Sequence, residues 1–243
     1  MTLDDAIINF SKTYINERND WYCWRRINEK KIPLGVTLPQ GNQYIKNIAL
    51  KKELNKKWIA TKSSKEKKLI TSYYISTWGG IHGNSDKNID LYSRSGADDL
   101  ITRGSKGIAS WSKAICLHNP YKYAIYDARV SASLNSLQII NNIENKLFFP
   151  IPSSRNNIIG TGAKYIKKEA TNTKWKSAEE SDFYMKYLVV SLIFYQKIRH
   201  ESYLQNNSFL IDNYYFLTIM YSRPTTMVIV YSSQNQAHAN NWK

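Results

Sequence analysis

The stretch from Ser110 to Leu134 reads SWSKAICLHNPYKYAIYDARVSASL, and it decides most of the predicted fold. Its first half completes an apolar helix that is predicted over 108–118. Asn119-Pro120 ends that helix, because the residue before a proline is disfavoured in the helical region. A short extended segment then leads to Asp127, which begins a second predicted helix over 128–140. Two helices joined by a short apolar connection indicate an α-helical core.

Outward from this stretch the chain reads mainly as helices, and no internal repeat is visible. Hydrophobic periodicity and capping signals, such as the capping box of Ser177 with Glu180, define most of them. Loops rich in proline or glycine are predicted at 31–43 and 149–157. We therefore predict a mainly α fold in which 1–243 form a single domain, with a division into two lobes left open. The other predicted helices span residues 3–18, 44–58, 64–77, short pieces of 86–101, about 177–205 and about 208–221, and one strand is predicted at 227–232.

The composition favours a folded protein with a polyanionic partner. The 243 residues include 34 Lys+Arg and 19 Asp+Glu, which gives a formal net charge of +15 and a sequence pI near 9.6. Nucleic acid is the partner that such a charge most often indicates, and a solvated basic surface is the alternative. The longest apolar run, Tyr187–Tyr195, is far shorter than the roughly 20 residues that span a bilayer. With two distant cysteines and no basic secretory signal, we expect a cytoplasmic protein that does not enter a membrane.

Several common catalytic motifs are absent from the sequence. It contains no P-loop, no HExxH and no GxSxG. Its histidines are widely scattered along the chain, at His82, His118, His200 and His238. We therefore predict no metal site and no organic cofactor.

Asp127 is the candidate catalytic residue. A carboxylate at a helix N-terminus is kept anionic by the helix dipole and by backbone N–H donors. Such a group can stabilise the positive charge that develops on a sugar when a glycosidic bond breaks, and it can orient the attacking water. Asp is also a favoured N-cap, so plain capping is the alternative, and the two roles can coexist.

Three short motifs follow one another in this region. Thr77–Ser85 reads TWGGIHGNS, Ser112-Lys113 follows, and Tyr126-Asp127 comes last, with Arg129 and Val130 just after it. The segment around Asp127 resembles the catalytic segment of the helix-hairpin-helix DNA glycosylases, in which an apolar approach leads to Asp, any residue and a basic residue. The order of the three motifs is similar to that in bacterial proteins related to this superfamily, and anti-phage glycosylases that remove modified bases are the nearest functional idea. The resemblance covers about residues 70–140.

This resemblance implies a fold, a reaction and a partner. The fold would be a helical fold like that of the helix-hairpin-helix glycosylases. The reaction would be hydrolysis of the N-glycosidic bond of a flipped-out damaged or modified base, such as a modified cytosine of phage DNA. Asp127 would stabilise the transition state, and water would be the nucleophile. The partner would be duplex DNA, and the resemblance implies neither a cofactor nor an obligate protein partner.

The expected hairpin of this family is harder to place. It is usually LPGVGxxTA and precedes the aspartate by about twenty residues, but that region reads ITRGSKGIASWSKA here. A closer match is IIGTGAKYI at Ile158–Ile166, in which Gly160, Gly162 and Lys164 are expected to grip a DNA phosphate through backbone N–H groups. An ordinary turn before a basic helix is the alternative. Because Asp182 lies eighteen residues beyond Lys164, these two residues form a second, lower-ranked catalytic pair.

Other residues are candidates for substrate binding. Lys113 lies fourteen residues before Asp127, closer than the family spacing for a Schiff-base lysine, so it is a candidate for catalysis or phosphate binding, with a merely solvated role as the alternative. The walls of a base pocket are expected from Trp78, Trp111 and Tyr126, with core packing as the alternative for each. Further DNA contacts are expected from Lys106, Arg129 and a basic group formed by Lys51, Lys52, Lys56, Lys57, Lys62, Lys65, Lys67 and Lys68.

Two other functions stay open at this point. A basic helical protein can recognise damaged or modified DNA as a non-catalytic binding module, which would show salt-dependent binding but no base release. The same charge also suits an enzyme or toxin that acts on RNA.

Overall fold

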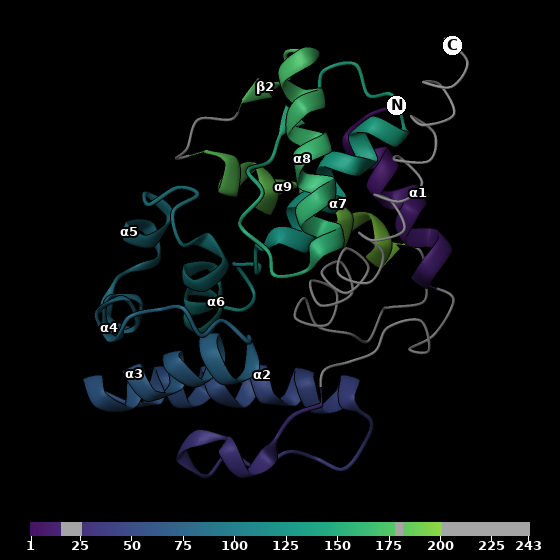
Figure 1. Cartoon of the computed structure of the whole chain (residues 1–243). Coiled ribbons are helices and arrows are strands. Elements are labelled where there is room, and N and C mark those ends of the chain that lie inside the picture. The colour runs from purple at the N-terminus through teal and green to yellow at the C-terminus, as the bar shows by residue number, and fades with distance from the viewer. Residues whose placement is uncertain (16–25, 178–181, 201–243) are drawn as a thin grey trace.

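The computed structural model describes residues 1–15, 26–177 and 182–200, and helices dominate these ranges. Figure 1 shows α2 and α3 at one end of the molecule, α8 towards the other end, and α6 between them. The predicted mainly α class is therefore confirmed. None of the described helices is long and apolar enough to cross a membrane. The helices are α1 (Leu3–Ile15), α2 (Gln43–Ala60), α3 (Ser64–Ser72), α4 (Asp86–Arg94), α5 (Ala97–Ile101), α6 (Ile108–His118), α7 (Ala128–Ile140), α8 (Asn157–Asn172) and α9 (Phe183–His200), and the strands β1 (Leu147–Phe148) and β2 (Lys176–Ser177) pair in parallel.

The helices on either side of Asp127 have the predicted bounds. α6 ends at His118 before Asn119-Pro120, and α7 begins at Ala128. The helix predicted over 64–77 is also confirmed, but it consists of α3 followed by a π-helical turn over Tyr73–Trp78. Such π-helical turns are uncommon and are often found near functional sites.

The predicted start of the last described helix is wrong. Ser177 does not cap a helix but lies in β2, where it is paired with Phe148, and the N–H group of Lys176 donates to the carbonyl of Lys146 (3.0 Å). Pairing with β1 holds this backbone extended, so α9 begins only at Phe183. The helix predicted at 208–221 and the strand at 227–232 lie outside the described residues.

A buried segment without helix or strand, residues 123–126, connects the end of α6 to Asp127. Two of its carbonyl groups accept hydrogen bonds from α9: Tyr184 donates to Ala124 and Tyr187 donates to Ile125, each at 2.7 Å. Both tyrosines have no exposed surface. An unpaired buried carbonyl would cost free energy, so these hydrogen bonds favour one conformation of the segment. They thereby help to set the position of Asp127.

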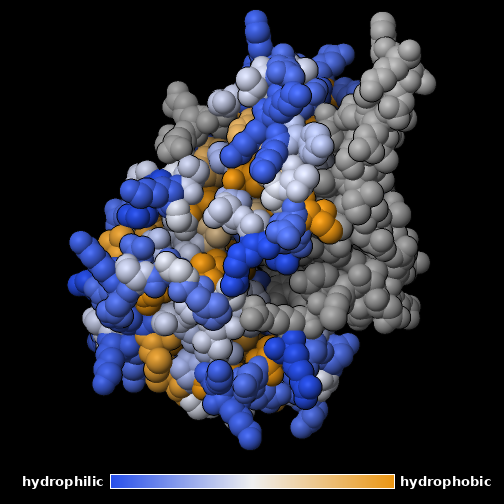
Figure 2. Space-filling view, in the orientation of Figure 1, coloured by the Kyte–Doolittle hydropathy of each residue, from blue (hydrophilic) through white to orange (hydrophobic). Residues whose placement is uncertain are grey.

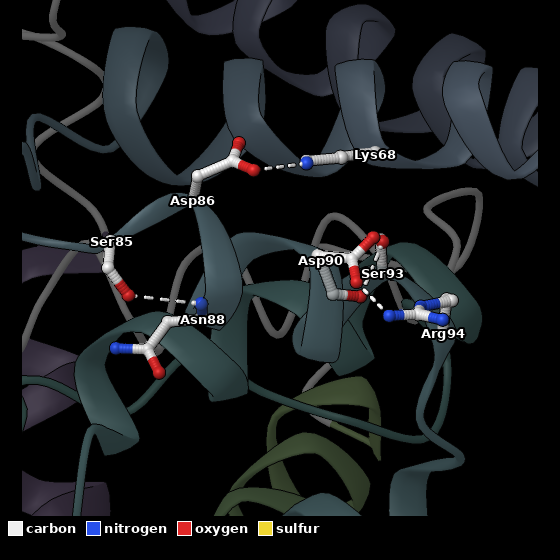
Figure 3. A network of polar contacts seen from close by, with 7 residues as sticks. All are labelled: Lys68, Ser85, Asp86, Asn88, Asp90, Ser93 and Arg94. Carbon is white, nitrogen blue, oxygen red and sulfur yellow. Dashed lines mark hydrogen bonds and ion pairs between the residues drawn. The ribbon is translucent and has the colours of Figure 1, made fainter.

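Polar contacts join α3 to α4 on the surface (Figure 3). The ammonium group of Lys68 on α3 lies 2.6 Å from a carboxylate oxygen of Asp86, the first residue of α4. The hydroxyl of Ser85 accepts from the N–H group of Asn88 (3.2 Å) and caps this helix. At its other end Arg94 pairs with Asp90. The positive charges of Lys68 and Arg94 are thus already compensated within the protein.

Candidate functional site

Asp127 caps α7 and reaches the surface of a pocket. One of its carboxylate oxygens, Oδ1, accepts hydrogen bonds from the N–H groups of Arg129 (2.9 Å) and Val130 (3.2 Å). Within the described ranges its second oxygen accepts no hydrogen bond. The side chain is half-buried, and it lines a pocket beside the N-terminus of α7. Asp127 therefore caps α7, which was the alternative to a catalytic role, and it also lines a pocket.

The pocket has a volume of about 600 Å³ and brings together segments that are distant in the sequence. The N-terminal ends of α6, α7 and α8 all contribute to its lining, so the positive ends of three helix dipoles converge on it. Arg129 and Arg155 add positive charge, while Asp127 is the single carboxylate among the described lining residues. The pocket is therefore suited to a substrate that carries negative charge. Its walls come from 79–83, 107–110, 127–129 and 152–156, together with Ser105 and Lys113.

Lys113 is the buried amine of this pocket. Its side chain is almost fully buried, and Nζ reaches back one turn along α6 to donate to the carbonyl of Ala109 (2.9 Å). Burial lowers the pKa of Lys113, while the negative charge of Asp127 acts in the opposite direction. Gly79 packs closely against the lysine, since a Cβ atom at Gly79 would lie 2.8 Å from its Cε. The absence of a side chain at Gly79 thus leaves room for the Lys113 stem.

A glycine-containing turn precedes α6 and opens onto the same pocket. α5 ends at Ile101, and the chain turns through residues 102–107 before α6 begins. Gly104 (φ 57°) and Gly107 (φ 73°) both adopt the left-handed conformation, which other residues rarely tolerate. A Cβ atom at Gly107 would also lie only 2.6 Å from the hydroxyl of Tyr92. Lys106 is exposed on this turn. Together, α5, the turn and α6 form a helix–turn–helix unit immediately before the Asp127 segment.

The predicted hairpin at Ile158–Ile166 is wrong. Gly160 and Gly162 lie inside α8, which begins at Asn157 under the cap of Asn156. The N–H group of Gly160 donates to the carbonyl of Asn156 (2.9 Å), so it is used within the helix and cannot grip a phosphate. Gly162 is buried on the same side as Ile159, where α8 packs on Ala128 and Ala132 of α7. Unlike these helical glycines, Gly104 and Gly107 adopt the left-handed conformation.

The second catalytic pair is not part of the pocket. Lys164 is exposed on α8, and Asp182 is exposed just before α9. Neither residue lines the pocket that contains Asp127 and Lys113. The pocket therefore contains the first pair of candidates and neither residue of the second.

The predicted aromatic walls lie elsewhere in the fold. Trp111 and Tyr126 have no exposed surface and belong to the core, where the hydroxyl of Tyr126 donates to the carbonyl of Pro150 (2.7 Å). Trp78 is half-buried against Tyr74, with ring centroids 4.6 Å apart, and its Nε1 donates to Asn47 (2.8 Å). None of the three lines the pocket. Core packing, the alternative for each, describes all three, and His82 provides the aromatic ring among the described lining residues.

Sequence reasoning missed one basic residue of the pocket, Arg155, and it wrongly expected Lys51, which is buried, to contact DNA. Arg155 donates from Nη2 to the carbonyl of Gly80 (2.7 Å), which links the loop before α8 to the glycine-rich loop after the π-helical turn. Lys51 of α2 is buried, with its ammonium 5.6 Å from the centroid of the Trp78 ring, and burial lowers its pKa to about 7. The loop at 149–157 was predicted, but nothing in its sequence indicates that it folds back over residues 79–83.

Comparison of the chain with known families, proteins and structures identifies no relative. No family model matches the chain, and neither a curated protein nor a solved structure matches it. In the described part of the chain, no group of three or more His, Cys, Asp and Glu side chains is arranged to hold a metal ion.

Proposed function

We propose that the protein is a DNA glycosylase with a fold like that of the helix-hairpin-helix glycosylases. One observation carries the proposal: the carboxylate of Asp127 and the amine of Lys113 line one pocket, directly after a glycine turn that leads into α6. Gly107 of this turn precedes Asp127 by twenty residues, which is the separation that the resemblance implies for the hairpin. We therefore propose the turn at 102–107, rather than Ile158–Ile166, as the hairpin.

In the proposed reaction Asp127 acts on the sugar of a flipped-out nucleotide. The bond between C1′ and the base nitrogen breaks, and the base leaves with the bonding electron pair and takes up a proton. The oxygen of Asp127 that accepts no hydrogen bond faces the positive charge that develops on the sugar and stabilises it. Water adds its oxygen to C1′ and gives a proton to the carboxylate. The products are a free base and an abasic site in an intact strand.

The burial of Lys113 suits this reaction. A protonated amine beside the sugar would oppose the positive charge of the transition state, and burial favours the neutral amine. Because Nζ of Lys113 donates to the carbonyl of Ala109, this nitrogen lies one turn nearer the N-terminus of α6 than the Lys113 backbone does. Ala109 precedes Asp127 by eighteen residues. We propose that Lys113 binds the sugar or its phosphate and that water remains the nucleophile.

The proposed substrate is DNA that carries a damaged or modified base. A volume of about 600 Å³ lies within the roughly 300–1,000 Å³ that is usual for ligand pockets, so a base with a substituent can be accommodated. The cationic lining and the three helix N-termini suit the phosphates beside a flipped nucleotide. A modified cytosine of phage DNA is the substrate that the resemblance favours.

A base-release assay tests the proposal. Wild type, Asp127→Asn and Asp182→Asn are incubated with damaged-base oligonucleotides and with phage DNA that carries modified cytosines. Because Asn is also a good N-cap, Asp127→Asn should remain folded while it loses the carboxylate. We expect base release from wild type and Asp182→Asn but not from Asp127→Asn.

Two other results would change the mechanism or the class of protein. Strand cleavage without alkali that is lost in Lys113→Met would make Lys113 a nucleophile. Tight DNA binding without base release by wild type would favour the non-catalytic binding module.

A further inference from the structure

The outer face of α8 is polar and basic along its whole length. Ile159, Gly162 and Ile166 are the buried residues of this helix. Residues on the opposite side recur every three or four positions and are all exposed. Figure 2 shows hydrophilic side chains over this end of the molecule. We call this set the outer face of α8, and it consists of Asn157, Thr161, Lys164, Lys168 and Asn172, with Lys167 beside it.

The lysines of this face form no ion pair with the carboxylates of the described residues. Lys164, Lys167 and Lys168 have no carboxylate within ion-pair distance among the residues that the structure describes. The single acidic residue of the helix, Glu169, is half-buried at the flank. Within the described ranges, the outer face therefore offers these lysines to an external partner.

The lysines of α2 and α3, the other basic group of the sequence, are in a different situation. Lys56 pairs with Glu53 (2.7 Å), and Lys68 pairs with Asp86 (2.6 Å; Figure 3). Lys67 lies over the ring of Trp58, 4.3 Å from its centroid. These three of its eight lysines are thus engaged in intramolecular contacts.

The outer face of α8 is also continuous with the pocket. Asn156 caps the helix and lines the pocket, so α8 begins at the pocket and leads away from it towards β2 (Figure 1). At a rise of about 1.5 Å per residue, Lys168 lies roughly 18 Å along the helix from Asn156. With one phosphate per strand for about every 3.4 Å of B-DNA, this length matches about five phosphates.

We propose that the outer face of α8 binds the phosphate backbone of the DNA strand that enters the pocket. Lysine ammonium groups supply the attraction, and the hydroxyl of Thr161 and the amide of Asn157 are donors that suit phosphate oxygens. The side chain of Tyr165, also exposed, offers a ring beside Lys164 and Lys168. That the polyanion is DNA rests on the proposed function, whereas the location of its backbone rests on α8 itself.

The test compares two double variants that lose the same charge. Lys164→Gln/Lys168→Gln removes two lysines of the outer face, and Lys30→Gln/Lys31→Gln removes two exposed lysines of the short helix Glu29–Lys31 at the other end of the molecule. The dissociation constant of a fluorescent duplex oligonucleotide is measured by anisotropy at several salt concentrations. We expect the first variant to bind about tenfold or more weakly in ~0.1 M salt and to lower the slope of log K against log salt by about 2. The second should keep the wild-type slope.

The outcome for α8 is separate from the outcome for the enzyme. Equal slopes for the two double variants would overturn the proposal for the outer face, even if wild type releases base. A selective loss of slope in Lys164→Gln/Lys168→Gln would support it, even if no base is released and the protein proves to be a binding module. Failure of wild type to bind DNA at low salt would overturn it as well.

Discussion

The hydroxyl of Ser112 forms two hydrogen bonds with the backbone of Tyr126. It donates to the Tyr126 carbonyl (3.1 Å) and accepts from the Tyr126 N–H group (3.0 Å), and all of these groups are buried. Tyr126 is the residue before Asp127, and Lys113 follows Ser112 on α6. The Ser-Lys pair and the Tyr-Asp pair therefore meet in space: Ser112 holds the Asp127 segment in place, while Lys113 lines the pocket.

Ser112→Ala should both destabilise the fold and reduce base release. The substitution leaves two buried backbone groups of Tyr126 without a partner, which costs about 1–3 kcal/mol. Urea unfolding measures the stability, and base release below the unfolding midpoint measures the activity. Ser191→Ala is the control, because the buried Ser191 hydroxyl makes one bond within α9, to Tyr187 (3.1 Å). Equal stability and equal activity of the two variants would refute the role of Ser112.

Gly160→Ala should stabilise the protein. Gly160 lies inside α8, and a Cβ atom there would meet no other atom within 4 Å. Alanine in place of glycine in a helix interior contributes about 0.5–1 kcal/mol. Thermal unfolding should show a higher midpoint than for wild type. A lower midpoint would return Gly160 to a turn and restore the hairpin interpretation of Ile158–Ile166.

Gly107→Ala should destabilise the protein. Gly107 has a φ of 73°, and a Cβ atom would lie 2.6 Å from the Tyr92 hydroxyl. The left-handed conformation alone costs about 1–2 kcal/mol for alanine. Gly83→Ala is the control, since a Cβ atom at this pocket glycine would lie in open space. In a Tyr92→Phe background, Gly107→Ala should lower the free energy of unfolding by less than it does in wild type. An equal decrease in the two backgrounds would show that the contact with the Tyr92 hydroxyl is irrelevant.

Lys51→Met should alter the pH dependence of stability. Burial lowers the pKa of Lys51 from 10.5 to about 7, so above pH 7 the unfolded chain binds a proton that the folded protein lacks. The free energy of unfolding of wild type therefore rises with pH, by up to about 1.4 kcal/mol per unit from this lysine. Burial also lowers the pKa of Lys113 and adds a slope of the same sign.

The useful window for this test is pH 7–9. Burial raises the pKa of Cys116 from 9.0 to about 12 in the folded protein. Above pH 9 this thiol therefore makes the free energy of unfolding fall with pH, opposite to the effect of Lys51. Urea unfolding of wild type and Lys51→Met at pH 7, 8 and 9 should show a smaller slope for the variant. Parallel pH profiles would mean that Lys51 titrates alike in the folded and unfolded states.

Local signals in the sequence predict the helices around Asp127 well. The Asn119-Pro120 break and the N-cap of Asp127 depend on residues that are adjacent in the chain, and α6 and α7 have the predicted bounds. The pocket depends instead on distant segments, such as Arg155 reaching Gly80, for which no local signal exists. The hairpin failed because a pattern with two glycines does not report whether the backbone is helical or left-handed. Trp111 and Tyr126 were misplaced because an aromatic side chain suits a core and a base pocket equally well.

The most direct measurement of the central claim is a product balance on DNA that carries a modified base. Mass spectrometry counts the free base, and an abasic endonuclease counts the abasic sites in the same sample. For wild type we predict one free base for each abasic site in otherwise intact strands, and for Asp127→Asn neither product above background while its unfolding curve remains cooperative. Equal base release by wild type and Asp127→Asn, or none from any modified DNA by wild type, would contradict the proposed catalytic role of Asp127.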